Sequence, residues 1–212
     1  MAHPVSVISP NYCAPHPVDL AIVEKVKTGG KFDVIDVEGN VVFKVKEPFS
    51  FFRGRTLLLD AAGNPIVTLR PKASSLHSTW KVFRGDSTDS NNLLFSVKRS
   101  KIFFQFKITL DVFLANNTRE DVCDFKAKGN FSQRSCVIYA GNSSTVIAQM
   151  HEKQSPQSVF FGKDKFMVTV NPNIDYAFII ALIVIVYEIN KPKSSFSHHS
   201  SHHSSHHSVG HC

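Results

Sequence analysis

The sequence contains few cysteines. Among its 212 residues there are only four, Cys13, Cys123, Cys136 and Cys212, and none of them form a C-x-x-C pair. Four such dispersed thiols are too sparse to cross-link a domain of this size, which excludes a disulfide-rich secreted scaffold. Residues 1–20 also lack a basic segment followed by a long apolar one, so the sequence predicts no secretory signal. These absences favour an intracellular protein.

Motifs that carry catalytic chemistry are missing as well. No G-x-G-x-x-G sequence, Walker A loop or G-x-S-x-G sequence occurs. His151-Glu152 begins like a zinc-protease motif, but Ser155 stands where the second histidine is needed. Cys13 and His16 lie in a proline-rich segment without a third group to orient them, as a catalytic pair requires. The sequence therefore predicts a protein that is not an enzyme and needs no cofactor.

Both ends of the chain lack charged residues, and in the part between them Lys and Arg outnumber Asp and Glu. The formal net charge is +7, and every Asp, Glu, Lys and Arg lies between Asp19 and Lys193. A basic body attracts anionic partners such as phospholipid headgroups or nucleic acid. The same charge also fits an ordinary, well-solvated surface. The net charge therefore favours anionic partners as a class but identifies no particular partner.

The central part of the chain alternates apolar and polar residues with a period of two. This alternation is typical of strands with one buried face. It occurs in Phe43–Lys46, Trp80–Val82, Phe95–Lys98, Phe104–Ile108 and Val168–Val170. The sequences IDVEGN and LLDAAGN, and more loosely IYAGN, place Gly and Asn where a chain reverses between antiparallel strands. We therefore expect successive β-hairpins in an antiparallel sheet that closes into a barrel or folds into a sandwich.

No apolar run is long enough to span a bilayer. The longest, Ala177–Tyr187, has 11 residues, whereas a helix needs about 20 to cross hydrocarbon. Asn173 and Asp175 suit a helix start and Lys191-Pro192 suits a stop, which predicts a helix over about 174–190. The Ile and Val content would also permit a strand. A helix apolar on all sides needs surrounding protein or lipid, and a curved sheet would supply the protein.

The composition divides the chain into one domain and two tails. Residues 1–17 are rich in proline and are expected to be flexible, residues 18–192 form the domain, and residues 193–212 form a disordered Ser/His-rich tail. Tail histidines could bind Zn²⁺, Ni²⁺ or Cu²⁺ loosely, although a tail offers no second shell to order a metal site. These weak metal candidates are His198, His199, His202, His203, His206 and His207.

Two stretches combine cations with aromatic residues, as surfaces for phosphate groups or anionic membranes do. In KRSKIFFQFK the candidate anion-binding residues are Lys98, Arg99, Lys101 and Lys107. In PFSFFRGR they are Arg53 and Arg55, beside Phe51 and Phe52. In both stretches the aromatic residues could instead be buried, which would leave only solvated cations on the surface.

The ordered series of motifs resembles the plant LURP-one-related family over about residues 11–190. The segments that carry this resemblance are NYCAPHPVDLAIVEK, DVEGNVVFKVKEP, LLLDAAGNPIVTLR, WKVFRGDST, LLFSVKRS, CDFKAKGNF, RSCVIYAG and VTVNPNIDYAFIIALIVIV. The resemblance implies a tubby-like fold: a closed antiparallel β-barrel of about 12 strands enclosing a hydrophobic C-terminal α-helix, related to the phospholipid scramblases.

The resemblance also shapes the expected function. Tubby proteins bind phosphoinositides and have been proposed as membrane-tethered transcription factors, and the founding LURP-one member is linked to responses to pathogens. We expect a phosphoinositide- or anionic-lipid-binding peripheral module with a role in plant defence or stress signalling. A regulator that binds protein or nucleic acid without lipid is the alternative. The expected location is cytoplasmic, peripheral at the plasma membrane, or nuclear.

Overall fold

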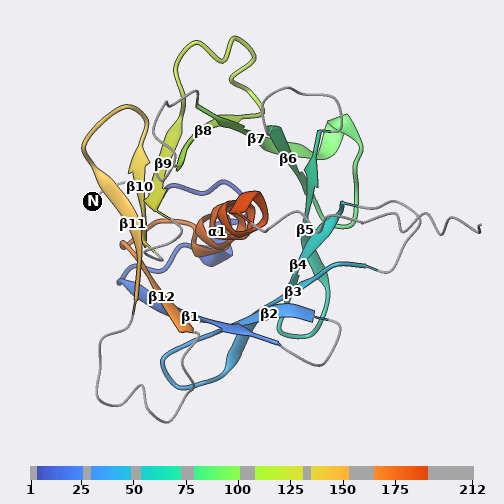
Figure 1. Cartoon of the computed structure of the whole chain (residues 1–212), viewed down its shortest axis with the longest axis vertical. Helices are drawn as coiled ribbons and strands as arrows, with labels where there is room; N and C mark the ends of the chain where they lie inside the picture. Colours follow the sequence, from blue (N-terminus) through green and yellow to red (C-terminus); the bar gives the residue numbers. More distant parts are fainter. Residues whose placement is uncertain are drawn as a thin grey trace, which may run out of the picture.

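A closed β-barrel surrounds one helix in the computed structural model of the chain (Figure 1). The structure describes residues 4–25, 30–48, 54–72, 79–100, 108–130, 135–152 and 165–190. Each strand pairs antiparallel with the next along the chain, and β1 pairs with β12 to close the ring. The predicted closed barrel of twelve antiparallel strands around a C-terminal helix is thus confirmed.

The strands are short and follow one another with few intervening elements. The strands of the described part are β1 (Val18–Glu24), β2 (Gly30–Ile35), β3 (Val41–Lys46), β4 (Thr56–Asp60), β5 (Pro65–Pro71), β6 (Thr79–Arg84), β7 (Leu93–Arg99), β8 (Ile108–Leu114), β9 (Phe125–Asn130), β10 (Ser135–Ala140), β11 (Val146–Glu152) and β12 (Lys165–Val170). Two 3₁₀ turns, Pro10–Tyr12 and Ser90–Asn92, and the helix α1 (Tyr176–Asn190) complete the described elements.

The hairpin turns expected from the repeated Asp-x-x-Gly-Asn sequence are present. In the β2–β3 turn, Asp36 Oδ1 accepts hydrogen bonds from the backbone N–H groups of Glu38 and Asn40, each at 2.9 Å. In the β4–β5 turn, Asp60 Oδ1 accepts from Gly63 and Asn64 in the same way. Gly63 has a φ of +100°, a conformation that side chains with a Cβ rarely adopt. These bonds to the carboxylates lower the pKa of both aspartates, with the side chain of the turn asparagine as the largest cause.

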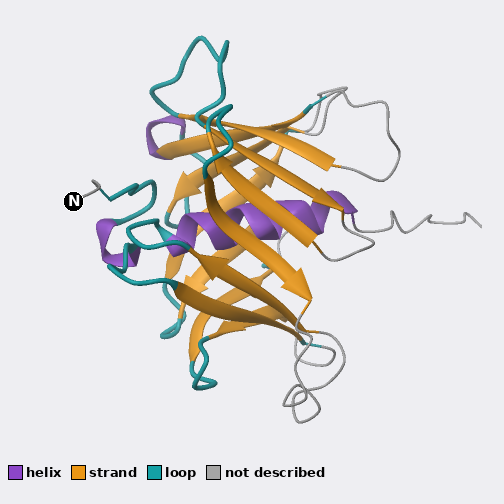
Figure 2. Ribbon diagram, turned by 90° about the vertical axis from the view of Figure 1, so that its left-hand side faces the viewer, coloured by secondary structure: helices purple, strands orange, loops and turns teal. Residues whose placement is uncertain are grey.

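The helix α1 forms the core of the barrel, as Figure 2 shows from the side. All ten residues from Ala177 to Val186 are buried. At its N-terminal half, Phe178 contacts Phe95 of β7 and Phe125 of β9, with ring centroids 5.1 and 4.9 Å apart. The apolar run, for which the sequence permitted either a helix or a strand, forms a helix. A lone strand inside a barrel would leave its backbone N–H and C=O groups unpaired. In the described part of the chain, no helix is long and apolar enough to cross a bilayer.

The buried carboxylate of Asp175 joins the helix to the N-terminal segment. Its Oδ1 atom accepts from the backbone N–H of Phe178 at 3.0 Å and so caps the first turn. Its Oδ2 atom accepts from the backbone N–H groups of Val7, Ile8 and Ser9 at 3.1, 2.7 and 3.0 Å. Asp175 is fully buried and Ile8 is 4% exposed. The proline content of residues 1–17 predicts a flexible segment and gives no sign of these contacts.

The other end of the helix is fastened by a lysine that a β-bulge turns inward. The β2–β3 register passes from Gly30 opposite Lys46 to Phe32 opposite Val45, which leaves Lys31 as the extra residue. The Lys31 ammonium forms an ion pair with Glu188 near the end of α1 and donates to Thr56 Oγ1 at 3.2 Å. The Lys31 side chain is 8% exposed, so its charge needs these partners.

Candidate functional site

Three of the six predicted anion-binding residues lie in the described part of the chain. These are Arg55, Lys98 and Arg99, whereas Arg53, Lys101 and Lys107 fall outside the described residues. The aromatic residues beside them at 51, 52, 103, 104 and 106 fall outside too, as do the tail histidines. Within the described ranges, no cluster of three or more His, Cys, Asp or Glu residues could hold a metal ion.

Lys98 lies on the outside of β7 and already has a partner. Its ammonium forms an ion pair with Glu120 and lies 5.4 Å from the ring centroid of Phe113. Glu120 also accepts from Ser96 Oγ at 3.1 Å. Burial opposes ionisation of Glu120, but the hydrogen bonds from Lys98 and Ser96 and the charges of Lys98 and Lys81 lower its pKa overall. The positive charge of Lys98 is therefore partly neutralised.

Arg55 is paired as well. Its guanidinium forms an ion pair with Asp86, which follows β6, and the two side chains are 27% and 48% exposed. Its Nε atom is buried and has no hydrogen-bond partner among the described residues. Arg99, at the end of β7, is exposed and takes part in none of the ion pairs between described residues. Of the three predicted cations that the structure describes, two are paired and Arg99 takes part in no ion pair between described residues.

Strand register brings together further cations that the sequence reading missed. Arg70 of β5 lies directly opposite Lys81 of β6, and both side chains are exposed. Lys81 in turn lies opposite Ser96, whose hydroxyl donates to Glu120. Arg55 precedes Thr56, which lies opposite Leu69, the neighbour of Arg70. A row of basic side chains thus crosses the outside of β4, β5 and β6.

Five cations at outward positions on or beside the strands from β3 to β7 make up what we call the outer basic surface. Its residues are Lys46, Arg55, Arg70, Lys81 and Lys98. The strands that carry them are neighbours along one side of the barrel in Figure 1. Asp86 and Glu120 pair with two of the five, whereas no ion pair between described residues includes the other three. Among these three, Arg70 and Lys81 lie directly opposite each other on β5 and β6.

The Arg70–Lys81 pair is unfavourable in the isolated protein. Residues directly opposite on antiparallel strands have Cβ atoms about 4.5–5.5 Å apart, and like charges at this spacing destabilise a sheet. An anion placed over the pair would remove this repulsion. Only the register reveals the pair, because Arg70 and Lys81 are separated in sequence by residues 71–80 and lie in strands that each show an unremarkable alternation.

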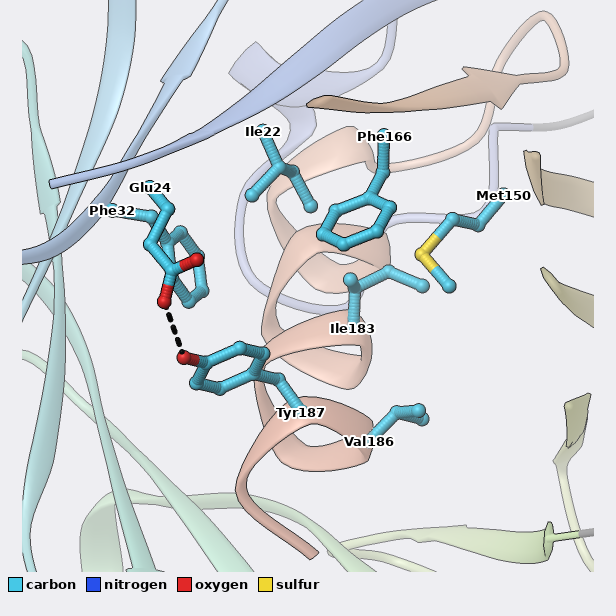
Figure 3. A pocket seen from close by; sticks show the side chains of 8 residues that line it. All are labelled: Ile22, Glu24, Phe32, Met150, Phe166, Ile183, Val186 and Tyr187. Atoms are coloured by element: carbon cyan, nitrogen blue, oxygen red, sulfur yellow. Dashed lines mark hydrogen bonds between the residues drawn. The ribbon is translucent and has the colours of Figure 1, made fainter. Parts of the chain in front are cut away.

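A second feature is an apolar pocket between α1 and the barrel wall, shown in Figure 3. Its lining comes from β1, β2, β11, β12 and the C-terminal half of α1. The lining residues are Ile22, Glu24, Phe32, Met150, Phe166, Ile183, Val186 and Tyr187. The Tyr187 hydroxyl donates to Glu24 Oε1 at 3.0 Å. Burial, with this hydrogen bond and the charge of Glu24, raises the pKa of Tyr187 to about 12. No sequence pattern indicates this pocket, which forms only when the helix packs against the barrel wall.

The surroundings of Cys13, the thiol weighed as a nucleophile, favour its protonated form. The Cys13 Sγ atom lies 3.6 Å from the Val5 carbonyl oxygen. Burial, with the nearby charge of Asp175, raises the pKa of Cys13. Because the thiolate is the reactive species, this environment weakens Cys13 as a nucleophile.

Comparison with known proteins agrees with the architecture. A sequence profile described as LURP-one-related matches residues 18–187. The chain is similar to Protein LURP-one-related 15 of Arabidopsis thaliana, with 54% identity over 187 residues that cover 87% of this chain and 86% of that protein. It is also similar to Protein LURP1 of the same plant, with 49% identity over 193 residues that cover 90% and 93% of the two chains. Neither name describes an enzymatic activity.

The fold has a counterpart among solved structures. An X-ray structure of an Arabidopsis thaliana protein matches with a TM-score of 0.71 and 48% sequence identity, covering 88% of this chain and 99% of that one. Because the profile spans most of the chain and the relatives align over nearly their whole length, this protein belongs to the LURP-one-related family.

Proposed function

We propose that this protein is a non-enzymatic module that binds anionic phospholipid, phosphoinositide headgroups foremost, through the outer basic surface. The observation that carries the proposal is the exposed Arg70–Lys81 pair, two like charges held opposite each other on β5 and β6, neither of which takes part in an ion pair between described residues. A phosphate group placed between them would accept hydrogen bonds from both side chains and relieve their repulsion.

The expected attachment is weak and sensitive to salt. Each Lys or Arg near an anionic leaflet contributes about 1 kcal/mol, and this contribution falls off within a Debye length. The three cations outside the ion pairs of the described residues therefore supply about 3 kcal/mol, and Arg55 and Lys98 add less because Asp86 and Glu120 compete with the lipid. Attachment of this strength is reversible and suits a peripheral protein.

The alternative partner is nucleic acid or an acidic protein surface. Binding of single-stranded nucleic acid usually adds aromatic side chains on which bases stack. On the described part of the outer basic surface, Phe113 is the aromatic ring beside Lys98, and it is only 7% exposed. Within the described part of this surface, exposed charge without an exposed ring favours a phosphate headgroup over stacked bases. The role in plant defence or stress signalling remains a prediction from the family resemblance.

The test compares liposomes and charge variants. Wild-type protein should sediment with phosphoinositide liposomes, fail to sediment with neutral phosphatidylcholine liposomes, and detach as salt increases. The variant Arg70→Glu/Lys81→Glu should bind at least about tenfold more weakly, since about 1.4 kcal/mol corresponds to a factor of ten.

A matched control separates a local effect from net charge. The variant Arg119→Glu/Lys128→Glu makes the same change in charge at two exposed residues outside the outer basic surface. It should retain most of the binding. Equal binding to neutral liposomes, or equal losses in the two variants, would contradict the proposal. A gel-shift assay with DNA and a pull-down with an acidic protein would then test the alternative, which predicts binding in one of the two.

A further inference from the structure

The loop between β8 and β9 places a carboxylate on the outer basic surface. Glu120 of this loop forms an ion pair with the Lys98 ammonium through Oε2, and its Oε1 atom accepts from Ser96 Oγ at 3.1 Å. Ser96 lies opposite Lys81 of β6, so the Lys81 charge also acts on Glu120. The carboxylate therefore lies among two cations and one hydroxyl donor of the barrel wall.

The backbone of this loop holds Glu120 by contacts of its own. Glu120 has a φ of +53°, a left-handed conformation that residues other than Gly, Asn and Asp seldom adopt. Its backbone N–H donates to Asn117 Oδ1 at 3.1 Å, and Asn117 Nδ2 donates to the Val122 carbonyl oxygen and to Asp124 Oδ2, each at 2.8 Å. Conformations of this kind persist only where the surroundings enforce them, and they are concentrated at ligand and switch sites. The loop thus presents Glu120 to the wall in a defined position.

The partners of Glu120 are groups that would also bind a phosphate. An ammonium and a hydroxyl both donate hydrogen bonds to phosphate oxygens. A phosphate monoester carries about 1.5–2 negative charges at neutral pH and has three acceptor oxygens, whereas a carboxylate carries one charge and has two oxygens. Such a phosphate could take the bonds from Lys98 and Ser96 and still offer an oxygen to Lys81.

We propose that Glu120 occupies the subsite for a phosphate monoester of the lipid headgroup, formed by Lys81, Ser96 and Lys98, and that headgroup binding displaces it. This role of Glu120 rests on the proposed function, because it concerns the choice of ligand at the outer basic surface. A phosphodiester, as in phosphatidylglycerol, carries a single charge and gains little over the carboxylate that it must replace. The built-in carboxylate therefore makes the surface select phosphate monoesters over other anionic lipids.

Liposome binding of a matched pair of variants tests this selection. Glu120→Gln removes the competing charge, whereas Asp121→Asn makes the same change of charge at the next residue, which is 61% exposed and pairs with Arg119. On liposomes that contain phosphatidylglycerol, Glu120→Gln should bind at least about fivefold more tightly than Asp121→Asn, as expected for one charge beside an anionic leaflet. Wild-type protein should prefer phosphatidylinositol 4-phosphate to phosphatidylglycerol at equal total charge, and Glu120→Gln should lose part of this preference. Glu120→Gly, which suits the positive φ, should bind as Glu120→Gln does.

A spectroscopic signal reports the displacement itself. In wild-type protein labelled with ¹³C at the glutamate carboxyl groups, saturation with inorganic pyrophosphate at neutral pH should shift the Glu120 signal, because its carboxylate loses Lys98 and Ser96. The signal of Glu38, in the β2–β3 turn, should stay in place and serves as the internal control.

The outcomes separate this role of Glu120 from the proposed function. If wild-type protein binds phosphoinositide liposomes, equal affinities of Glu120→Gln and Asp121→Asn, or an unmoved Glu120 signal at saturation, would overturn the role of Glu120 alone. Absence of binding by the wild type and by both Glu120 variants would overturn the two proposals together. Binding by the Glu120 variants without binding by the wild type would support the role of Glu120 and contradict the proposed function.

Discussion

Removal of the Asp175 carboxylate should strongly destabilise the barrel. The fully buried side chain accepts four backbone N–H groups, three from the segment Val7–Ser9 and one from Phe178. In Asp175→Ala the helix loses its N-cap, which costs about 1 kcal/mol. If the N-terminal segment detaches to hydrate its three N–H groups, the burial of Ile8 is lost as well, at about 1.5–3 kcal/mol. The expected loss in the free energy of unfolding is about 2.5–4 kcal/mol.

Asp175→Asn should lose less than Asp175→Ala. An asparagine keeps one carbonyl oxygen for the Val7–Ser9 amides or for Phe178, but its NH₂ group then faces the remaining N–H donors. For a chain of this length, 1 kcal/mol moves the melting temperature by about 2–4 °C, so the alanine variant should melt about 5–16 °C lower.

Urea unfolding followed by tryptophan fluorescence measures this effect. Trp80 is the single tryptophan of the chain and lies 7% exposed on β6, so its emission reports the integrity of the barrel. Asp121→Asn serves as the control, because this carboxylate is 61% exposed and pairs with the surface residue Arg119. If Asp175→Ala were no more destabilising than Asp121→Asn, the described role of Asp175 would be wrong.

Two further predictions concern the helix and its surroundings. Ile183→Asp buries an unpaired carboxylate at a position that is 4% exposed, so it should cost at least about 4 kcal/mol of stability or prevent folding. The control Val37→Asp, at a residue that is 75% exposed, should leave circular dichroism and solubility unchanged. A folded, soluble Ile183→Asp protein would contradict the enclosed helix. The pKa of Tyr187 rises from 10.0 to about 12, so between these values the folded state keeps a proton that the unfolded state has released, and stability falls as pH rises. Urea unfolding across this range should show a smaller fall in Tyr187→Phe, and an identical fall in both proteins would refute that protonation difference.

Local sequence patterns predicted the strands and turns of the fold, because these elements depend mainly on residues close together in the sequence. Alternation of apolar and polar residues marks a strand with one buried face, and the Asp-x-x-Gly-Asn sequence carries its own turn, as the bonds of Asp36 and Asp60 show. The apolar run before Asn190 is too short to span a bilayer, and its length therefore predicts a segment buried inside the protein. These patterns left a barrel and a sandwich open, and the expectation of a closed barrel came from the family resemblance.

The candidate site was only partly predictable because it depends on register and tertiary packing. Lys98 and Arg55 were found from local clusters of charge, but nothing in the sequence shows that loops bring Glu120 and Asp86 to them. Arg70 and Lys81 become neighbours only when β5 and β6 align. Asp175 meets the Val7–Ser9 amides across more than 160 residues of chain, a separation over which no sequence pattern gives contact information.

The orientation of the protein on a membrane tests the proposed function most directly. In nanodiscs that contain phosphoinositide and a gadolinium-chelating lipid, paramagnetic broadening of backbone amide signals identifies the wall nearest the bilayer. The proposal predicts the strongest broadening in β5 and β6, which carry Arg70 and Lys81, and little in β12 and β1, which lie across the closed ring of strands. Strongest broadening at β12 and β1, or uniform broadening around the barrel, would contradict the outer basic surface as the lipid-binding face.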